Sequence, residues 1–218
     1  MKQLAALFVF AALTLPAAQA QQTLNDNVMA VVTPPLSSPA SAAATTKVLS
    51  RSEYKAQLRT AEETLKASPR NADALLRRAQ AHVELKDYKE ALADYSTLIR
   101  LQPTNAALYY ARGTAQLRDD QLARAIADYS KALKLDPAHL PSFLYRGVAK
   151  MKLANYKGAI PDFAQVIKLD ADNAEAYEYR GICYSLSNQD QLALPDLERA
   201  AALNPEAAKT LKRYRTDK

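Results

Sequence analysis

The segment FLYRGVAK, residues 143–150, contains an Arg-Gly pair whose place in the chain recurs at a fixed interval. That place is occupied in turn by Arg78-Ala79, Arg112-Gly113, Arg146-Gly147 and Arg180-Gly181. Each interval is thirty-four residues long. Self-similarity at a fixed period predicts a stack of identical supersecondary units, each of which needs its neighbours to bury its apolar face.

When Ala72 is counted as position 1, the same kinds of residue return in each unit. Position 4 is large, position 8 is glycine or alanine, position 20 is alanine and position 24 is large and apolar. Positions 4, 8 and 11, and positions 20, 24 and 27, each have the spacing of one helix face. The pattern therefore predicts two antiparallel helices per unit, with position 8 beside position 20 and position 4 beside position 24.

Helix stop and start signals fall between the units. Proline closes successive units at Pro69, Pro103, Pro137 and Pro205, and asparagine follows as a helix N-cap at Asn71, Asn105 and Asn173. His139 substitutes for the asparagine in one unit, and Ala171 for the proline. These signals bound the helical hairpins that the repeat pattern predicts.

These residues resemble the tetratricopeptide repeat (TPR) family, and the resemblance implies an all-α, right-handed α-solenoid of helix-turn-helix hairpins. Its parts would be a half-repeat helix at 50–71, TPR 1 at 72–105, TPR 2 at 106–139, TPR 3 at 140–173, TPR 4 at 174–207, and a C-terminal cap helix and tail at 208–218. Position 11 departs from the family pattern because it is polar in three repeats. Pro161 and Pro195 fall inside second helices, which we expect them to bend.

The first forty-nine residues have a different composition. Residues 1–20 combine Lys2, an apolar run from Leu4 to Leu15 and an Ala-Gln-Ala ending, which predicts a cleaved signal peptide. Residues 21–49 are small, polar and rich in proline, which predicts a disordered linker. We therefore expect an exported bacterial protein, periplasmic or secreted, with no transmembrane segment.

The arginine at position 7 is followed sixteen residues later by an aspartate in every unit. The candidate pairs are Arg78 with Asp94, Arg112 with Asp128, Arg146 with Asp162, and Arg180 with Asp196. Thr60 and Tyr214 stand where a further aspartate and a further arginine would be, so both series begin and end with the same four units. This favours structural ion pairs within each unit over pairs between units and over a repeated ligand site.

The TPR resemblance also implies that partner-binding residues line a concave groove, at positions 2, 5, 6, 9, 12 and 13 of the first helices. The candidate groove residues are Leu76, Arg77, Gln80, Tyr110, Thr114, Leu117, Leu144, Tyr145, Val148, Met151, Glu178, Tyr179 and Ile182. The lysines, asparagines and arginine with which some family members grip a C-terminal carboxylate are absent. An extended or helical peptide held by apolar and tyrosine contacts is therefore one interpretation, and tyrosines that pack between repeats are the other.

Residue patterns of other function classes are weak. His82, His139 and Cys183 lie in different repeats without metal-ligand spacing, and no glycine-rich phosphate loop occurs, so we expect no catalytic residue, metal or cofactor. The net charge of +6 is spread over interleaved acids and bases, which argues against a nucleic acid partner. We expect a non-enzymatic protein-interaction module of unknown partner and oligomeric state. The alternatives are an envelope-associated protein that binds polymer or membrane, and a solenoid that self-associates.

Overall fold

The computed structural model describes residues 49–216; the predicted signal peptide and nearly all of the predicted linker lie outside the described residues. Within this range the chain is helical and contains no strand. The helices are α2 (Arg51–Ala67), α3 (Ala72–Leu85), α4 (Tyr88–Leu101), α5 (Ala106–Arg118), α6 (Leu122–Leu135), α7 (Leu140–Lys152), α8 (Tyr156–Leu169), α9 (Ala174–Leu186), α10 (Asp190–Leu203), the 3₁₀ helix η1 (Pro205–Ala207) and α11 (Ala208–Thr216).

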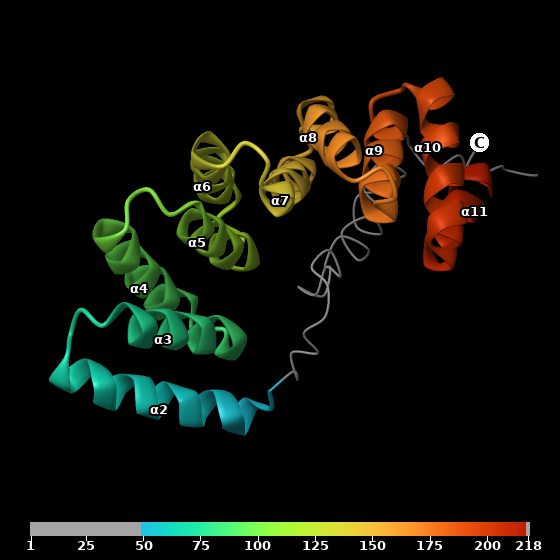
Figure 1. Cartoon of the computed structure of the whole chain (residues 1–218). Helices are drawn as coiled ribbons and strands as arrows, with labels where there is room; N and C mark the ends of the chain where they lie inside the picture. Colours follow the sequence, from blue (N-terminus) through green and yellow to red (C-terminus); the bar gives the residue numbers. More distant parts are fainter. Residues whose placement is uncertain (1–48, 217–218) are drawn as a thin grey trace, which may run out of the picture. The chain divides into compact units, whose positions relative to one another are not determined.

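The helices pack in chain order, as the succession of colours in Figure 1 shows. The pairs α3–α4, α5–α6, α7–α8 and α9–α10 form four helical hairpins, and each second helix packs on the first helix of the next hairpin. The helix α2 lies against α3 at one end of the series, and α11 lies against α10 at the other. Packing between nearest neighbours is characteristic of a solenoid. The predicted all-α solenoid is confirmed.

Each first helix begins at a side chain that accepts a hydrogen bond from its first turn. The caps of α3, α5 and α9 are Asn71, Asn105 and Asn173. In α7 the ring nitrogen Nδ1 of His139 accepts the backbone N–H of Ser142 over 3.3 Å. At the start of α2, Ser50 and Glu53 form the complete capping box. A side-chain acceptor satisfies a donor that has no partner inside the helix, which fixes where each helix starts.

The turn inside each hairpin passes through a left-handed backbone conformation at position 15. The residues are Lys86, Asp120, Ala154 and Asn188, with φ between 56° and 70°. None of them is glycine, although this conformation costs L-residues roughly 1–2 kcal/mol. The same dihedral recurs with four different side chains, so the geometry of the hairpin imposes it.

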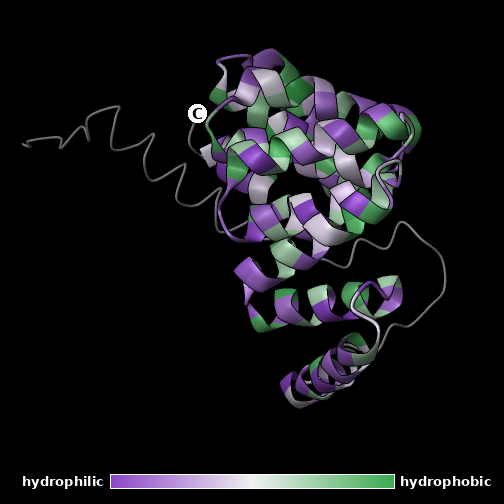
Figure 2. Cartoon of the chain, turned by 90° about the vertical axis from the view of Figure 1, so that its left-hand side faces the viewer, coloured by the Kyte–Doolittle hydropathy of each residue, from purple (hydrophilic) through white to green (hydrophobic). Residues whose placement is uncertain are grey.

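Apolar and polar residues alternate around the helices (Figure 2), and the apolar ones meet inside the hairpins. Contrary to our expectation, the small residue at position 8 faces mainly position 24. A Cβ added to Gly147 would lie 2.7 Å from the ring of Phe163, and one added to Gly113 would lie 3.0 Å from that of Tyr129. In repeat 4 the added Cβ on Gly181 would meet both Leu197 of position 24, at 2.9 Å, and the carbonyl oxygen of Ala193 of position 20, at 3.2 Å. The glycine therefore makes room for the large side chain at position 24.

Pro161 and Pro195 lie within α8 and α10, and both helices continue through them. The bend that we expected at these prolines stays a prediction.

Candidate functional site

An arginine and an aspartate of the same repeat form a two-point ion pair in each hairpin. The shortest N–O distances are 2.6 Å for Arg78–Asp94, 2.7 Å for Arg112–Asp128, 2.6 Å for Arg146–Asp162 and 2.7 Å for Arg180–Asp196. The four aspartates are only 2–7% exposed. Two-point, charge-assisted hydrogen bonds of this kind are strong and fix the orientation of both groups. The hydrogen bond to aspartate is also the main reason why the pKa of Arg78, Arg112 and Arg180 is raised.

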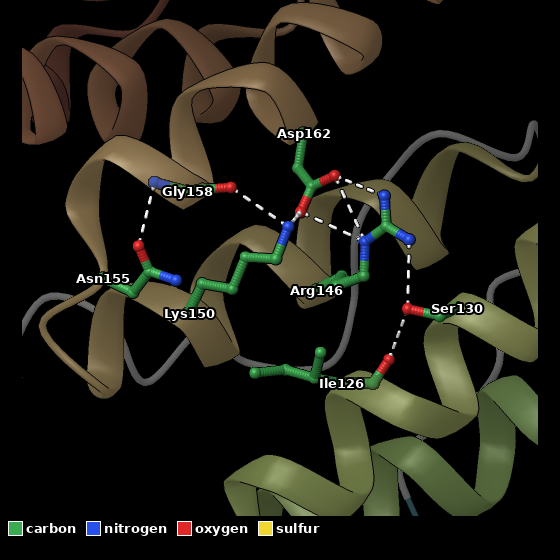
Figure 3. Close-up of polar contacts among 7 residues, drawn as sticks. All are labelled: Ile126, Ser130, Arg146, Lys150, Asn155, Gly158 and Asp162. Carbon is green, nitrogen blue, oxygen red and sulfur yellow. Dashed lines mark hydrogen bonds and ion pairs between the residues drawn. The ribbon is translucent and has the colours of Figure 1, made fainter.

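Two of these arginines also bond to the preceding repeat. Nη1 of Arg112 donates to Oγ of Ser96 over 3.1 Å. Nη1 of Arg146 donates to Oγ of Ser130 over the same distance (Figure 3). Both serines occupy position 25 of a second helix. One guanidinium group therefore joins three helices. No pattern in the sequence predicted this contact between repeats.

Aromatic rings at position 4 flank the same guanidinium groups. The distances from Cζ to the ring centroid are 6.0 Å for Arg112 and Tyr109, 5.6 Å for Arg146 and Phe143, and 5.6 Å for Arg180 and Tyr177. A cation within about 6 Å of a ring face is attracted by the ring quadrupole. Each of these three arginines thus contacts both a carboxylate and an aromatic ring.

Repeat 3 supplies its aspartate with a second cation (Figure 3). Nζ of Lys150 lies 2.7 Å from the carboxylate of Asp162 and 3.0 Å from the carbonyl oxygen of Gly158. Lys150 is one of the polar residues at position 11, and Gly158 lies in the turn before Pro161. The lysine therefore joins the carboxylate of Asp162 to the backbone of the first turn of α8.

Most of the candidate groove residues in repeats 2 to 4 are buried. These are Thr114, Leu144, Tyr145, Val148, Met151, Tyr179 and Ile182. Tyr145 stacks on Tyr129 of the preceding repeat, with ring centroids 6.3 Å apart, and Tyr179 packs on Phe163 at 5.5 Å. Burial raises the pKa of both hydroxyl groups. Tyr145 and Tyr179 therefore pack between repeats, which is the second of the two interpretations above.

Tyr110 completes a cluster of rings at the joint between repeats 2 and 3. Its half-buried ring lies 6.1 Å from Tyr129, 6.0 Å from Tyr145 and 5.0 Å from the ring of His139. Leu117 packs against the same cluster. We call Tyr110, Tyr129, Tyr145 and His139 the joint cluster.

The other candidates have separate surroundings. Glu178 is half-buried, and its carboxylate accepts the hydroxyl of Thr210 from the cap helix α11 over 2.5 Å. Leu76 is half-buried on α3. Arg77 and Gln80, also on α3, are exposed, and Arg77 takes part in no ion pair within residues 49–216.

The open part of the candidate surface is a groove between α2 and α3, with a volume of about 830 Å³. Its walls include Gln57, Thr60 and Thr64 from α2 and Arg77 and Gln80 from α3. Gln57 and Thr64 occupy positions 20 and 27 of the half-repeat, which in a complete hairpin face the first helix. The groove thus lies on the face of α2 that a first helix would cover. The repeat pattern predicted the half-repeat, but we did not infer from it that this face of α2 would be uncovered.

The remaining chemically reactive side chains form no common site. Cys183 is buried, which raises the pKa of its thiol. In the described part of the chain, no three histidine, cysteine, aspartate or glutamate side chains gather in a way that could hold a metal ion. No helix between residues 49 and 216 has both the length and the apolar composition needed to cross a membrane.

Three family models match the chain: a TPR repeat at residues 79–120, a tetratricopeptide repeat that overlaps it at 106–139, and another tetratricopeptide repeat at 144–209. Together with the stacked hairpins, these matches show that the chain belongs to the tetratricopeptide repeat family. No curated protein sequence matches it.

Solved structures share the fold at low sequence identity. A crystal structure of MamA is 21% identical and has a TM-score of 0.67 over 73% of this chain and 93% of MamA. MamA from Desulfovibrio magneticus RS-1 is 15% identical, with a TM-score of 0.66 over 87% and 96%. YrrB, described as a TPR protein with an unusual peptide-binding site, is 22% identical, with a TM-score of 0.65 over 74% and 84%.

Proposed function

We propose that this protein is a non-enzymatic scaffold that binds a segment of a partner protein in the groove between α2 and α3. TPR proteins are in general protein-interaction modules, and the peptide-binding site named for YrrB shows that a protein of this fold can hold a peptide. The observation that carries the proposal is exposure. Arg77 and Gln80 are open in this groove, whereas most of the candidate groove residues of repeats 2 to 4 are buried.

The groove offers polar contacts in place of the tyrosine contacts that we first expected. The hydroxyls of Thr60 and Thr64 donate to carbonyl groups of their own helix, which leaves their lone pairs as acceptors. The side-chain amides of Gln57 and Gln80 can both donate and accept, and the guanidinium of Arg77 favours a carboxylate. Glu53 and Asp73 also line the groove. This donor and acceptor set suits the main chain of an extended segment that carries side chains of both charges. The volume of the groove is in the range of roughly 300–1,000 Å³ usual for binding sites.

A peptide selection on the full mature chain would test this proposal. Peptides selected from a random library should bind at least tenfold more weakly, by calorimetry, to Arg77→Ala and to Gln80→Ala. Arg100→Ala is the matched control, because Arg100 is an exposed arginine at the end of α4, outside the groove. We expect all three variants to keep the melting temperature of the parent.

Selected peptides whose affinity is unchanged by both groove substitutions would show that the partner binds elsewhere. If no peptide is selected and the protein is instead retained on acidic polymer or anionic vesicles in a salt-sensitive way, the envelope-binding alternative is favoured. A mass that rises with protein concentration would favour self-association.

We also propose that the chain is exported, periplasmic or secreted, because residues 1–20 carry the charge, apolar run and small-residue ending of a signal peptide. Export predicts that the protein recovered from its native cells begins near Gln21. An intact Met1 on the mature protein would contradict it.

A further inference from the structure

We propose that His139 is a proton-sensitive cap that loosens the joint between repeats 2 and 3 when the surroundings become acidic. This inference does not depend on which partner the groove binds.

The first observation is the kind of cap. The first helices α3, α5 and α9 are capped by asparagine, whose amide oxygen accepts a hydrogen bond at any physiological pH. The helix α7 is capped by a histidine, whose Nδ1 can accept only while it carries no proton. This nitrogen lies 3.3 Å from the backbone nitrogen of Ser142 and 2.8 Å from Oγ of the same residue. Ser142 is fully buried, so water cannot easily replace the lost acceptor.

The second observation is the position of the ring. His139 belongs to the joint cluster, where its ring lies 5.0 Å from that of Tyr110 on α5. Tyr110 in turn contacts Tyr129 of α6 and Tyr145 of α7. A change at the cap is therefore passed directly to the side chains that hold repeat 2 against repeat 3.

Protonation would change two interactions at the start of α7. Nδ1 would become a donor and would bond to Oγ of Ser142, 2.8 Å away. The amide of Ser142 would then lose its side-chain acceptor and keep only its bond to the carbonyl oxygen of His139, 3.0 Å away. The new positive charge would also lie at the positive end of the dipole of α7, where a cation is unfavourable. Both changes weaken the first turn of the helix.

The charged and titratable groups around the ring act in opposite directions. Burial lowers the pKa of His139 and is the largest influence, whereas Asp136, at the end of α6, raises it. The face of Tyr110 attracts a cation weakly. Tyr110, Tyr129 and Tyr145 are neutral in acid, as tyrosines ordinarily are, and burial raises the pKa of each hydroxyl further. Arg118 and Glu175 lie farther out and act on these tyrosines. On balance the pKa of His139 is lowered in the folded protein, so the ring loses its proton more easily there.

The sign of the pH effect follows from this direction. A group whose folded-state pKa is lowered binds protons better in the unfolded chain, so folding is favoured at high pH. The contribution of His139 to the stability of the folded state is fully present above its unfolded pKa of 6.5. It is lost as the pH falls through the lower pKa of the folded state. The relevant window therefore begins near pH 6.5 and extends downward.

Hydrogen exchange followed by mass spectrometry on the full mature chain would test the proposal, because the chain contains its own control. The first turn of α7 is compared with that of α3, which Asn71 caps. On going from pH 7.5 to pH 5.0, after correction for intrinsic exchange rates, the opening constant of residues 140–147 should rise about fivefold relative to residues 72–79. That ratio corresponds to about 1 kcal/mol, the usual loss for a cap.

Two substitutions make the result decisive. His139→Asn should remove the pH dependence of the α7 segment, because it keeps an acceptor that cannot be protonated, while all carboxylates remain. Asn173→His should confer a pH dependence on the α9 segment. If His139→Asn leaves the same fivefold change in place, the proton acts elsewhere and the proposal is wrong, whatever the absolute stability of the variant.

Discussion

Repeat 3 (residues 140–173) and repeat 4 (residues 174–207) place the same arginine–aspartate pair in different surroundings. In repeat 3, Asp162 receives both Arg146 and Lys150, and Arg146 reaches back to Ser130 of repeat 2. In repeat 4, Asp196 pairs with Arg180. Ala164 is at position 25 of repeat 3, where the two preceding repeats have serine. It therefore offers Arg180 no hydroxyl group.

The same repeat pattern forms two kinds of junction in this chain. Repeats 2 and 3 meet through the joint cluster and through a charged hydrogen bond, whereas repeats 3 and 4 meet through the ring contact of Phe163 with Tyr179. The stability of a solenoid is close to a sum of repeat and junction contributions. Substitutions at matched positions of the two repeats should therefore have unequal effects.

The largest inequality is expected at the buried carboxylates. Asp162→Ala should lower the free energy of unfolding by about 4 kcal/mol, because it leaves two cations, each only 20% exposed, without their partner. Asp196→Ala leaves one cation, Arg180, without its partner and should lower the free energy of unfolding by about 3 kcal/mol. Urea unfolding followed by circular dichroism measures both values. Equal losses in the two variants would mean that Lys150 adds nothing to the pair.

A smaller effect is expected at position 25. Ser130→Ala removes the bond from Arg146 and should cost about 1.5 kcal/mol, the lower end of the range for a hydrogen bond to a charged group. Ala164→Ser offers Arg180 the acceptor that its counterparts have and should gain about 0.5 kcal/mol. The same unfolding experiment applies. The double variant Ser130→Ala/Ala164→Ser should weaken the junction of repeats 2 and 3 and strengthen that of repeats 3 and 4. Unchanged relative stability of the two junctions would show that position 25 does not stabilise them.

The smallest effect is expected at the turns. Ala154→Gly should stabilise the protein by about 0.5–1 kcal/mol, because glycine adopts the left-handed conformation at φ 56° without strain. Asn188→Gly should change stability by only a few tenths of a kcal/mol, since asparagine tolerates this conformation. Thermal unfolding of the two variants separates them. A stabilisation at Asn188 as large as that at Ala154 would show that side-chain strain is not the cause.

The sequence predicted the hairpins and the ion pairs well, because both depend on short, repeated spacings. The interval of sixteen residues and the termination of both series at Thr60 and Tyr214 pointed to pairing within the repeat, and the structure places Arg146 and Asp162 together accordingly. The bond from Arg146 to Ser130 could not be predicted, because serine is common on exposed helix faces and carries no distinctive pattern.

The candidate groove could be predicted only in part. A position number says which way a side chain points, but its exposure depends on how closely neighbouring repeats approach. Tyr145 and Tyr179 therefore met the criteria for groove residues and yet pack against rings of the preceding repeat. Arg77 met the same criteria and is exposed, because α2 belongs to a half-repeat.

The ion pairs of the hairpins have a kinetic consequence. The bonds from Arg146 to Asp162 and to Ser130 each span sixteen residues, and the bond from Arg118 to Glu84 spans thirty-four. Chains whose contacts are this local in sequence lose little entropy on closing each loop and fold quickly. Because each contact lies within a hairpin or between neighbouring hairpins, folding can begin in any part of the solenoid and spread from repeat to repeat.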